Sequence, residues 1–250
     1  MLPLLYLWDS KAMYIGLSFE TVVHAHNAAQ IIVALEGTIK VEIENSWLEN
    51  SIFVIRPNTK HRIRLYGTVA LLLIDAEDTR MEFDSITGEL SRTTMASLKN
   101  CYARAYSTEE ALQLFHSIIS DIGLSEKINP VAIDERIQRC LEYIEQNLKE
   151  DLSMESICKI NGISESSFSH MFSKEVGLPF RRYLLWKRLK ESIAVFLREK
   201  KSLTEISVEM GFSDQAHFSN SFKDVFGVKP TFIFRNKLRI LYGLNRIKIS

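Results

Sequence analysis

The chain of 250 residues is 46% hydrophobic, a length and composition that favour one large or two ordinary domains with real cores. Its formal net charge of +0 would by itself argue against a protein that binds nucleic acid, but the charge is unevenly distributed. Residues 1–130 hold 11 Lys and Arg against 16 Asp and Glu, a balance of −5, and residues 131–250 hold 20 against 15, a balance of +5, so only the second half is suited to an acidic polymer.

The three cysteines, Cys101, Cys140 and Cys158, are odd in number and far apart in the sequence. This usage is typical of reduced thiols in a cytoplasmic protein and argues against a disulfide framework. The N-terminus lacks a basic segment followed by an apolar run, so we expect no signal peptide. No apolar stretch approaches the ~20 residues that span a membrane, so we expect no membrane partner.

Residues 1–76 are predicted to be β structure. Thr38–Glu44 alternates apolar and polar residues with period two, as a half-buried strand does. Similar reasoning indicates further strands over residues 13–24, 30–35, 51–55, 61–66 and 68–75, with glycines at 37 and 67 marking turns. Many short strands with frequent turns imply a sandwich or a barrel.

Four polar residues in this β region have the spacing of a known motif. His24 and His26, followed by Gln30 and Gly37, match the pattern H-x-H-x3-E-x6-G except that glutamine replaces glutamate. Pro57-x-x-x-His61 is similar to the shortened second part of the same motif, without the glycine that precedes the later histidine. The region therefore resembles a cupin. In metal-binding cupins, the matching histidines and glutamate hold a divalent metal.

Two interpretations of these residues stay open. They either hold a metal ion or hydrogen-bond and line a ligand pocket without one. A neutral amide is a poorer ligand for a hard cation than a carboxylate, and it removes a negative charge from the site. We therefore favour a ligand pocket and expect neither a metal nor another cofactor. The residues concerned are His24, His26, Gln30 and His61.

The middle of the chain is predicted to contain a polar segment and one amphipathic helix. Residues 77–100 indicate a linker or a loose barrel edge. Ser107 and Glu110 then have the spacing of a capping box, which predicts a helix over 107–123. Its apolar stripe, Leu112, Phe115, Ile118, Ile119 and Ile122, fits either a homodimer contact or packing against the protein's own barrel.

The C-terminal half is predicted to be α-helical. A helix over 133–147 precedes a first helix-turn-helix at about 152–177, a long basic helix over 180–198, and a second helix-turn-helix at about 202–227. In the second unit Ser202 can cap the first helix, and Gly211 can end it in a left-handed turn. Ser213 or Asp214 can then cap the second helix.

The two helix-turn-helix patterns repeat in register. Ser153 and Ser202, Ile157 and Ile206, and Gly162 and Gly211 are each 49 residues apart, whereas Phe168 and Phe218, Phe172 and Phe222, and Gly177 and Gly227 are each 50 apart. The one-residue slip falls at the turn, where an insertion is tolerated most easily. A single pattern of this kind would fit any helical hairpin, but two copies in register strongly indicate two DNA-binding units.

Two such units joined by one long helix resemble the AraC/XylS-type transcriptional regulators. The resemblance covers about residues 131–235, and the stretch from Gly211 to Pro230 is nearly the family signature. The sequence departs from the family at Cys158 and Ser207, where a small residue such as alanine is usual, and after Pro230. The resemblance implies a cupin-like ligand-sensing or dimerisation barrel over 1–90, a helical linker over 91–130, and a DNA-binding domain over 131–250.

The faces opposite the buried phenylalanines are expected to read DNA. We expect base contacts from Glu165, Ser166, Ser169, His170, Gln215, Ala216, Ser219 and Asn220, and phosphate contacts from Lys174, Arg181, Arg182, Lys187, Arg188 and Lys223. Neither face carries arginine, which commonly reads guanine, whereas glutamine and asparagine can pair with adenine. The sequence therefore predicts a site that leans toward A·T base pairs.

The function predicted from these features is a sequence-specific, cytoplasmic DNA-binding regulator of bacterial type that is not an enzyme. The resemblance implies an activator that contacts RNA polymerase, responds to a small-molecule effector and forms a homodimer through 107–123. The alternative is a metal-dependent cupin enzyme, or a metal sensor, with a DNA-binding tail. A third reading is a regulator controlled by a protein partner, without an effector.

Overall fold

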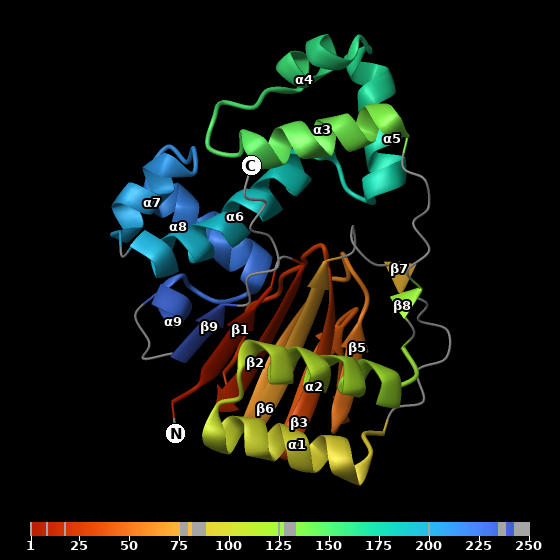
Figure 1. Cartoon of the computed structure of the whole chain (residues 1–250), viewed down its shortest axis with the longest axis vertical. Helices are drawn as coiled ribbons and strands as arrows, with labels where there is room; N and C mark the ends of the chain where they lie inside the picture. Colours follow the sequence, from red (N-terminus) through yellow and green to blue (C-terminus); the bar gives the residue numbers. More distant parts are fainter. Residues whose placement is uncertain are drawn as a thin grey trace. The chain divides into compact units, whose positions relative to one another are not determined.

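The computed structural model describes residues 2–8, 10–17, 19–75, 80–81, 89–124, 126–127, 134–199, 201–234 and 239–242. The chain forms two compact units (Figure 1). The first is built mainly from residues up to 128, and the second from residues 129–225 and 229–234. The expected order, a β-rich part followed by a helical part, is confirmed.

The first unit contains a seven-stranded sheet in the order β4-β3-β6-β2-β1-β9, with β5 also paired to β3. Neighbouring strands are antiparallel except β1 and β9, which are parallel. Across the described strands the path runs from β4 to β9 without closing, so the sheet is open where a closed barrel was expected. The strands are β1 Leu4–Leu7, β2 Lys11–Leu17, β3 Ala28–Ile43, β4 Ser46–Asn50, β5 Ile52–Ile55, β6 His61–Asp75 and β9 Arg239–Tyr242.

Strands β3 and β6 pair along their whole lengths and bend together at two glycines. Gly37 lies directly opposite Gly67, and their φ angles are +85° and +90°. A Cβ atom on Gly37 would lie 2.0 Å from the carbonyl oxygen of Tyr66. A strand boundary was expected at each glycine, and this prediction is wrong. The glycines bend the paired strands instead, because only glycine permits this backbone conformation and close approach.

Two helices, α1 (Arg92–Arg104) and α2 (Thr108–Asp121), lie across one face of the sheet (Figure 1). Helix α1 corrects the expected linker over 77–100, of which 77–79 and 82–88 lie outside the described residues. Ser91 caps α1 by accepting a hydrogen bond from the Thr94 amide. The buried residues of the helix, Leu98 and Cys101, belong to the same hydrophobic core as the sheet. Strands β7 (Arg80–Met81) and β8 (Glu126–Lys127) form a separate small pair.

The apolar stripe of α2 is buried within the first unit. The predicted capping box of Ser107 and Glu110 is present at its start. Phe115 is fully buried and meets Trp8 edge-on, with ring centroids 5.8 Å apart. Ile118, Ile119 and Ile122 belong to the same core. Of the two interpretations left open, the structure thus shows the stripe packed against the protein's own sheet.

The second unit is entirely helical in its described part. Its helices are α3 Glu135–Gln146, α4 Met154–Asn161, α5 Glu165–Val176, α6 Phe180–Glu199, α7 Leu203–Glu209, α8 Gln215–Phe226 and α9 Thr231–Phe234. The first helix-turn-helix is α4 with α5, and the second is α7 with α8. Among all described helices, none combines the length and apolar character needed to cross a membrane.

The helix boundaries reproduce the predicted repeat. Helices α4 and α7 start 49 residues apart (203 − 154), and α5 and α8 start 50 residues apart (215 − 165). The turn glycines Gly162 and Gly211 adopt φ angles of +62° and +74°. Ser153 and Ser202 cap α4 and α7, each accepting from the amide three residues later. The sequence spacing therefore determines the local structure of both units.

The paired glycines predict a specific cost in stability. Gly37→Ala should lower the free energy of unfolding of the first unit by more than about 1 kcal/mol. The alanine would have a strained backbone conformation, and its Cβ would also clash with the Tyr66 carbonyl. Gly162→Ala is the control, since its φ is also positive but nothing lies within 4 Å of the added Cβ. Urea unfolding followed by circular dichroism compares them. Equal losses of stability in both variants would contradict the predicted role of close approach.

Candidate nucleic-acid interface and histidine cluster

Helix α5 presents a polar face to solvent. Phe168 and Phe172 are fully buried on its inner side, and Ser164 caps its N-terminus. The outer side carries exposed polar residues, namely Glu165, Ser166, Ser169, His170 and Lys174. All five were predicted from the sequence to face DNA. Their exposure follows from the helical period, because the buried phenylalanines fix the rotation of the helix.

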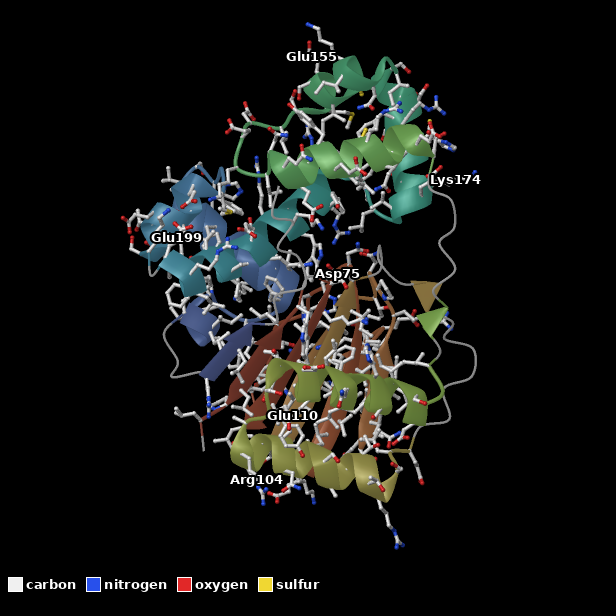
Figure 2. The ribbon with its side chains drawn as sticks, viewed as in Figure 1. Asp75, Arg104, Glu110, Glu155, Lys174 and Glu199 are labelled. Carbon is white, nitrogen blue, oxygen red and sulfur yellow. The ribbon has the colours of Figure 1, made fainter. Side chains whose placement is uncertain are left out.

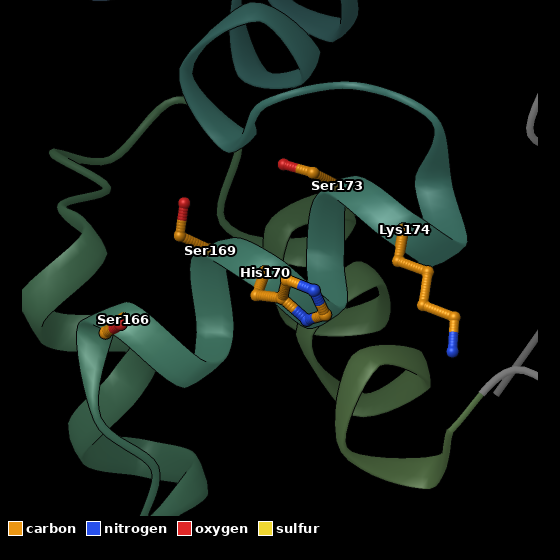
Figure 3. Close-up of a pocket in the computed structure, with 5 residues that line it drawn as sticks. All are labelled: Ser166, Ser169, His170, Ser173 and Lys174. Atoms are coloured by element: carbon orange, nitrogen blue, oxygen red, sulfur yellow. The ribbon is translucent and has the colours of Figure 1, made fainter.

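A shallow, open hollow follows this face of α5. It is lined by Ser166, Ser169, His170, Ser173 and Lys174, all from the one helix (Figure 3). Lys174 points outward near the C-terminal end of α5 (Figure 2). Hydroxyl and imidazole groups in the hollow can exchange hydrogen bonds with base edges, and the lysine can approach a phosphate.

Helix α8 presents the equivalent face of the second unit. Gln215, Ala216 and Asn220 are exposed, Ser219 is half-buried, and Phe218 on the opposite side is fully buried. The Oε1 atom of the glutamine accepts a hydrogen bond of 2.8 Å from the Thr204 hydroxyl, which orients the amide. Asp214 accepts a bond of 2.7 Å from the His217 amide, so the aspartate satisfies a free N–H at the helix start.

The predicted phosphate-binding residues differ in exposure. Arg181 and Arg182 are exposed in the first turn of α6, and Lys223 is half-buried on α8. Lys187 is half-buried, with its ammonium 5.6 Å from the centroid of the Tyr183 ring. The ring can therefore hold the lysine near α6 by a cation–π contact.

Arg188 was predicted to bind phosphate, but the structure gives its guanidinium an internal role. Its Nε atom donates to the Leu148 carbonyl at 3.2 Å, and a terminal nitrogen donates to the Glu150 carbonyl at 2.7 Å. Burial lowers its pKa below the usual value, and the charge of Asp151 opposes that shift. The guanidinium would also lie 3.0 Å from a Cβ added to Gly211. Helical periodicity could not show this, because the partners lie about 40 residues away.

An ion-pair network that no sequence pattern predicted lies beside this arginine. Glu209, near the end of α7, pairs with Lys149 from the loop after α3 and with Lys201 at 2.7 Å. These hydrogen-bonded ion pairs lower the pKa of Glu209. Together with Arg188, they join the α3–α4 loop to the second helix-turn-helix. No sequence motif marks them, because charged surface residues are common.

In the first unit, the structure brings together the four residues predicted to line a pocket. His24 and His26 are 5% exposed, Gln30 is 3% exposed and His61 is 1% exposed. One ring nitrogen from each histidine lies within 4.8 Å of the others, which makes this the metal-suited cluster among the described residues. Burial, and then the neighbouring rings, lower the pKa of His24 to about 3 and of His26 to about 4.

Comparison with known proteins agrees with this geometry. A helix-turn-helix domain family matches residues 157–236. "Probable transcriptional regulator LumQ" of Photobacterium leiognathi is 24% identical over 83% of this chain and 90% of its own length. The uncharacterised HTH-type transcriptional regulator YobQ of Bacillus subtilis is 24% identical over 86% of this chain and 89% of its own. Residues 157–236 thus form a helix-turn-helix DNA-binding domain, in a chain that is similar to proteins named as transcriptional regulators.

The fold of this chain is also seen in solved structures. A crystal structure of ToxT from Vibrio cholerae covers 92% of this chain and 100% of its own, with a TM-score of 0.61 and 14% sequence identity. At this identity the likeness concerns the fold alone. It covers most of the chain, and so it includes both the β-rich unit and the helical unit.

Two arginines of α6 are expected to differ in how much they contribute to the stability of the helical unit. Arg188→Ala should lower the free energy of unfolding of the helical unit by about 1.5–3 kcal/mol, because hydrogen bonds from a charged group to two carbonyls are lost. Arg181→Ala, at an exposed position, should change it by less than about 0.5 kcal/mol. Urea unfolding curves provide the measurement. Unchanged stability in the Arg188 variant would show that the guanidinium does not brace the unit.

Proposed function

We propose that this regulator binds double-stranded DNA sequence-specifically through α5 and α8, in the cytoplasm, and activates transcription. The single observation that carries the DNA interface is the repetition of one arrangement. Phe168 and Phe172 on α5, and Phe218 and Phe222 on α8, are all fully buried, which leaves a polar face outward on each helix. A helix of this kind can enter a major groove with that face toward the bases.

The base preference follows from the residues on these faces. Asn220 is exposed, and Gln215 is exposed with its amide oriented by Thr204. Each amide presents both a donor and an acceptor, the pair needed to contact the major-groove edge of adenine. The faces lack arginine, so a preference for A·T pairs is expected. Ser166, Ser169 and His170 would provide further contacts from α5.

Affinity would come largely from phosphate contacts. Lys174, Arg181 and Arg182 are exposed, and Lys187 and Lys223 are half-buried. Each phosphate that a cation neutralises releases counterions, so binding should weaken steeply with salt. Arg188 would support DNA binding indirectly. Its guanidinium donates to two backbone carbonyls and so stabilises the helical unit that carries α5 and α8.

The N-terminal unit would be the sensor, with RNA polymerase as the partner of the DNA-bound protein. One solved ToxT structure carries an unsaturated fatty acid, which supports a small-molecule effector for this chain as well. An effector that binds one arrangement of the molecule better than another shifts the population toward that arrangement. The histidine cluster is the site at which such an effector would act.

A homodimer through residues 107–123 remains a proposal. The apolar stripe of α2 is already buried against its own sheet. The exposed face of the same helix, which includes Glu109 and His116, would therefore have to form the contact. Such an interface would be more polar than the one expected from the sequence.

The second candidate function is a metal-dependent enzyme attached to a DNA-binding tail. Catalysis by a bound metal requires a position that a substrate can reach. His24, His26 and His61 are at most 5% exposed, which favours a sensory or structural site over a catalytic one.

Selection of bound sequences from a random DNA pool tests the proposed function. The wild-type protein should enrich an A·T-leaning motif, and Asn220→Ala should lose roughly 1–3 kcal/mol of discrimination at one position only. Asn100→Ala, at an exposed position on α1 of the first unit, is the matched control and should keep the motif. If the wild-type protein enriches nothing, sequence-specific binding is excluded.

The salt dependence of binding tests the phosphate contacts. Lys174→Ala should weaken binding similarly on all sequences and reduce the slope of log K against log salt by about 0.9, the loss of one phosphate contact. Lys99→Ala, exposed on α1, should leave the slope unchanged. Fluorescence anisotropy at several salt concentrations gives both slopes. Equal slopes for the two variants would remove Lys174 from the interface.

A further inference from the structure

Strand β4 lies at an edge of the sheet in the first unit. Among the described strands it pairs only with β3, and all of its residues are exposed. Two of them are large and apolar, since Trp47 is 39% exposed and Leu48 is 51% exposed. Proteins usually protect such an edge with proline, lysine, a bulge or a covering element. Residues 46–50 contain neither proline nor lysine, and their pairing with β3 is regular, so the edge is open to another strand.

The turn before β4 determines which of its backbone groups point away from β3. Ile43 and Ser46 pair across a two-residue turn, whose residues have φ angles of +52° and +63°. In such a hairpin the pair that flanks the turn is hydrogen-bonded, and bonded and non-bonded residues then alternate along the strand. The N–H and C=O groups of Trp47 and Glu49 therefore point outward. No hydrogen bond joins these groups to another described residue.

One register of two antiparallel β4 strands pairs all of these outward groups. In an antiparallel pair, residues with outward groups must lie opposite one another. Glu49 opposite Glu49 of a second copy would bring like charges together, and Trp47 opposite Trp47 would leave Glu49 beside the turn. Trp47 opposite Glu49 of the second copy avoids both problems. This register places Leu48 on a two-fold axis and pairs both residues of both strands.

The side chains around Trp47 suit the carboxylate that this register brings to it. The central guanidinium carbons of Arg62 and Arg64 lie 5.2 Å and 4.7 Å from the centroid of the Trp47 ring. Each arginine is also held by a glutamate of its own chain, Glu42 or Glu20, at 2.6 Å. A guanidinium has five N–H donors, so it can donate to a second carboxylate as well. The two arginines therefore form a fixed, positively charged surface beside the indole ring.

We propose that β4 is a homodimer interface, at which it pairs antiparallel with β4 of a second copy of this chain across a two-fold axis at Leu48. The Glu49 carboxylate of each copy then lies beside Trp47 and the two arginines of the other copy. The Leu48 side chains meet on the opposite face of the sheet. Within its own chain Glu49 pairs with Lys40 at 3.2 Å, but both side chains are exposed, so this pair competes weakly.

The proposed interface is small and differs from the exposed face of α2. A strand of five residues buries less than the ~1,600 Å² of a typical stable interface, so the dimer should be weak in dilute solution. Two copies bound at neighbouring DNA sites have a high effective concentration, which favours the same pairing. This role on DNA rests on the proposed function, whereas pairing of β4 in the free protein does not.

Sedimentation velocity of the full chain without DNA measures the dimer. The wild-type protein should shift from monomer to dimer as its concentration rises. Glu49→Pro should abolish the shift, because proline removes an outward N–H group that the dimer requires and that β3 does not bind. Glu49→Ala should raise the dimer Kd by about 2–30-fold, because it removes two symmetric cross-strand pairs and leaves the backbone intact. Circular dichroism verifies that each variant is folded.

Disulfide trapping at the two-fold axis tests the register. Leu48 would lie opposite Leu48 of the second copy in a non-hydrogen-bonded pair, with Cα atoms about 4.5 Å apart, a distance that a disulfide can bridge. Leu48→Cys should therefore give a covalent dimer on mild oxidation. Tyr66→Cys is the matched control, since its position is 50% exposed against 51% for Leu48, and it should not be trapped. The native cysteines are buried, so the wild-type protein should not be trapped either.

These measurements decide whether the β4 interface exists. A wild-type protein that stays monomeric, with no more disulfide in Leu48→Cys than in Tyr66→Cys, would overturn the proposal. A dimer that survives in Glu49→Pro would also overturn it, because that dimer must form elsewhere, as on α2. Neither measurement involves DNA, so failure of the β4 interface leaves the DNA-binding proposal intact.

A duplex that carries two copies of the enriched motif then tests the role on DNA. The wild-type protein should bind the two copies cooperatively, and Glu49→Pro should bind each copy equally well but without cooperativity. Fluorescence anisotropy with duplexes of one and two motifs measures both affinities. Equal cooperativity in the two proteins would exclude β4 from the assembly on DNA.

Discussion

Burial of two phenylalanines on each of α5 and α8 is the constraint on which the outward polar faces of these helices depend. Phe168 and Phe172 on α5, and Phe218 and Phe222 on α8, are fully buried, and their rings pack against other aromatic residues of their own unit. Two anchors four residues apart fix the rotation of a helix about its axis. The polar residues between them then face outward, whatever their individual identities.

The spacing between α5 and α8 depends on the contacts that join the two helix-turn-helix units. Helix α6 joins the units, and Arg188 on it ties the loop carbonyls of Leu148 and Glu150 to the region of Gly211. The pairs of Glu209 with Lys149 and Lys201 reinforce this connection. Helix α6 therefore carries two kinds of arginine. Arg181 and Arg182 are exposed near its start, whereas Arg188 is half-buried and hydrogen-bonds to backbone carbonyls of its own unit.

Four polar residues of the first unit, His24, His26, Gln30 and His61, are buried close together. Three imidazoles and an amide would be costly to bury without partners, and a backbone carbonyl lies within hydrogen-bond distance of the Nδ1 atom of each ring. The bend at Gly37 and Gly67 lets β3 and β6 stay paired over their full lengths. As a result, β6 begins with His61 beside the segment that carries His24 and His26.

The sequence by itself determined the order of a β unit and a helical unit, the two helix-turn-helix repeats, their caps, and the faces of α5 and α8, because these depend on local periodicity and on glycine at turns. Only the tertiary structure decided what depends on distant partners. It showed that Gly37 and Gly67 bend a continuous strand pair, that the stripe of α2 covers its own sheet, and that Arg188 binds carbonyls about 40 residues away. The histidine spacing was visible in the sequence, but only the backbone pairing of the segment before β3 with the start of β6 brings His61 beside His24.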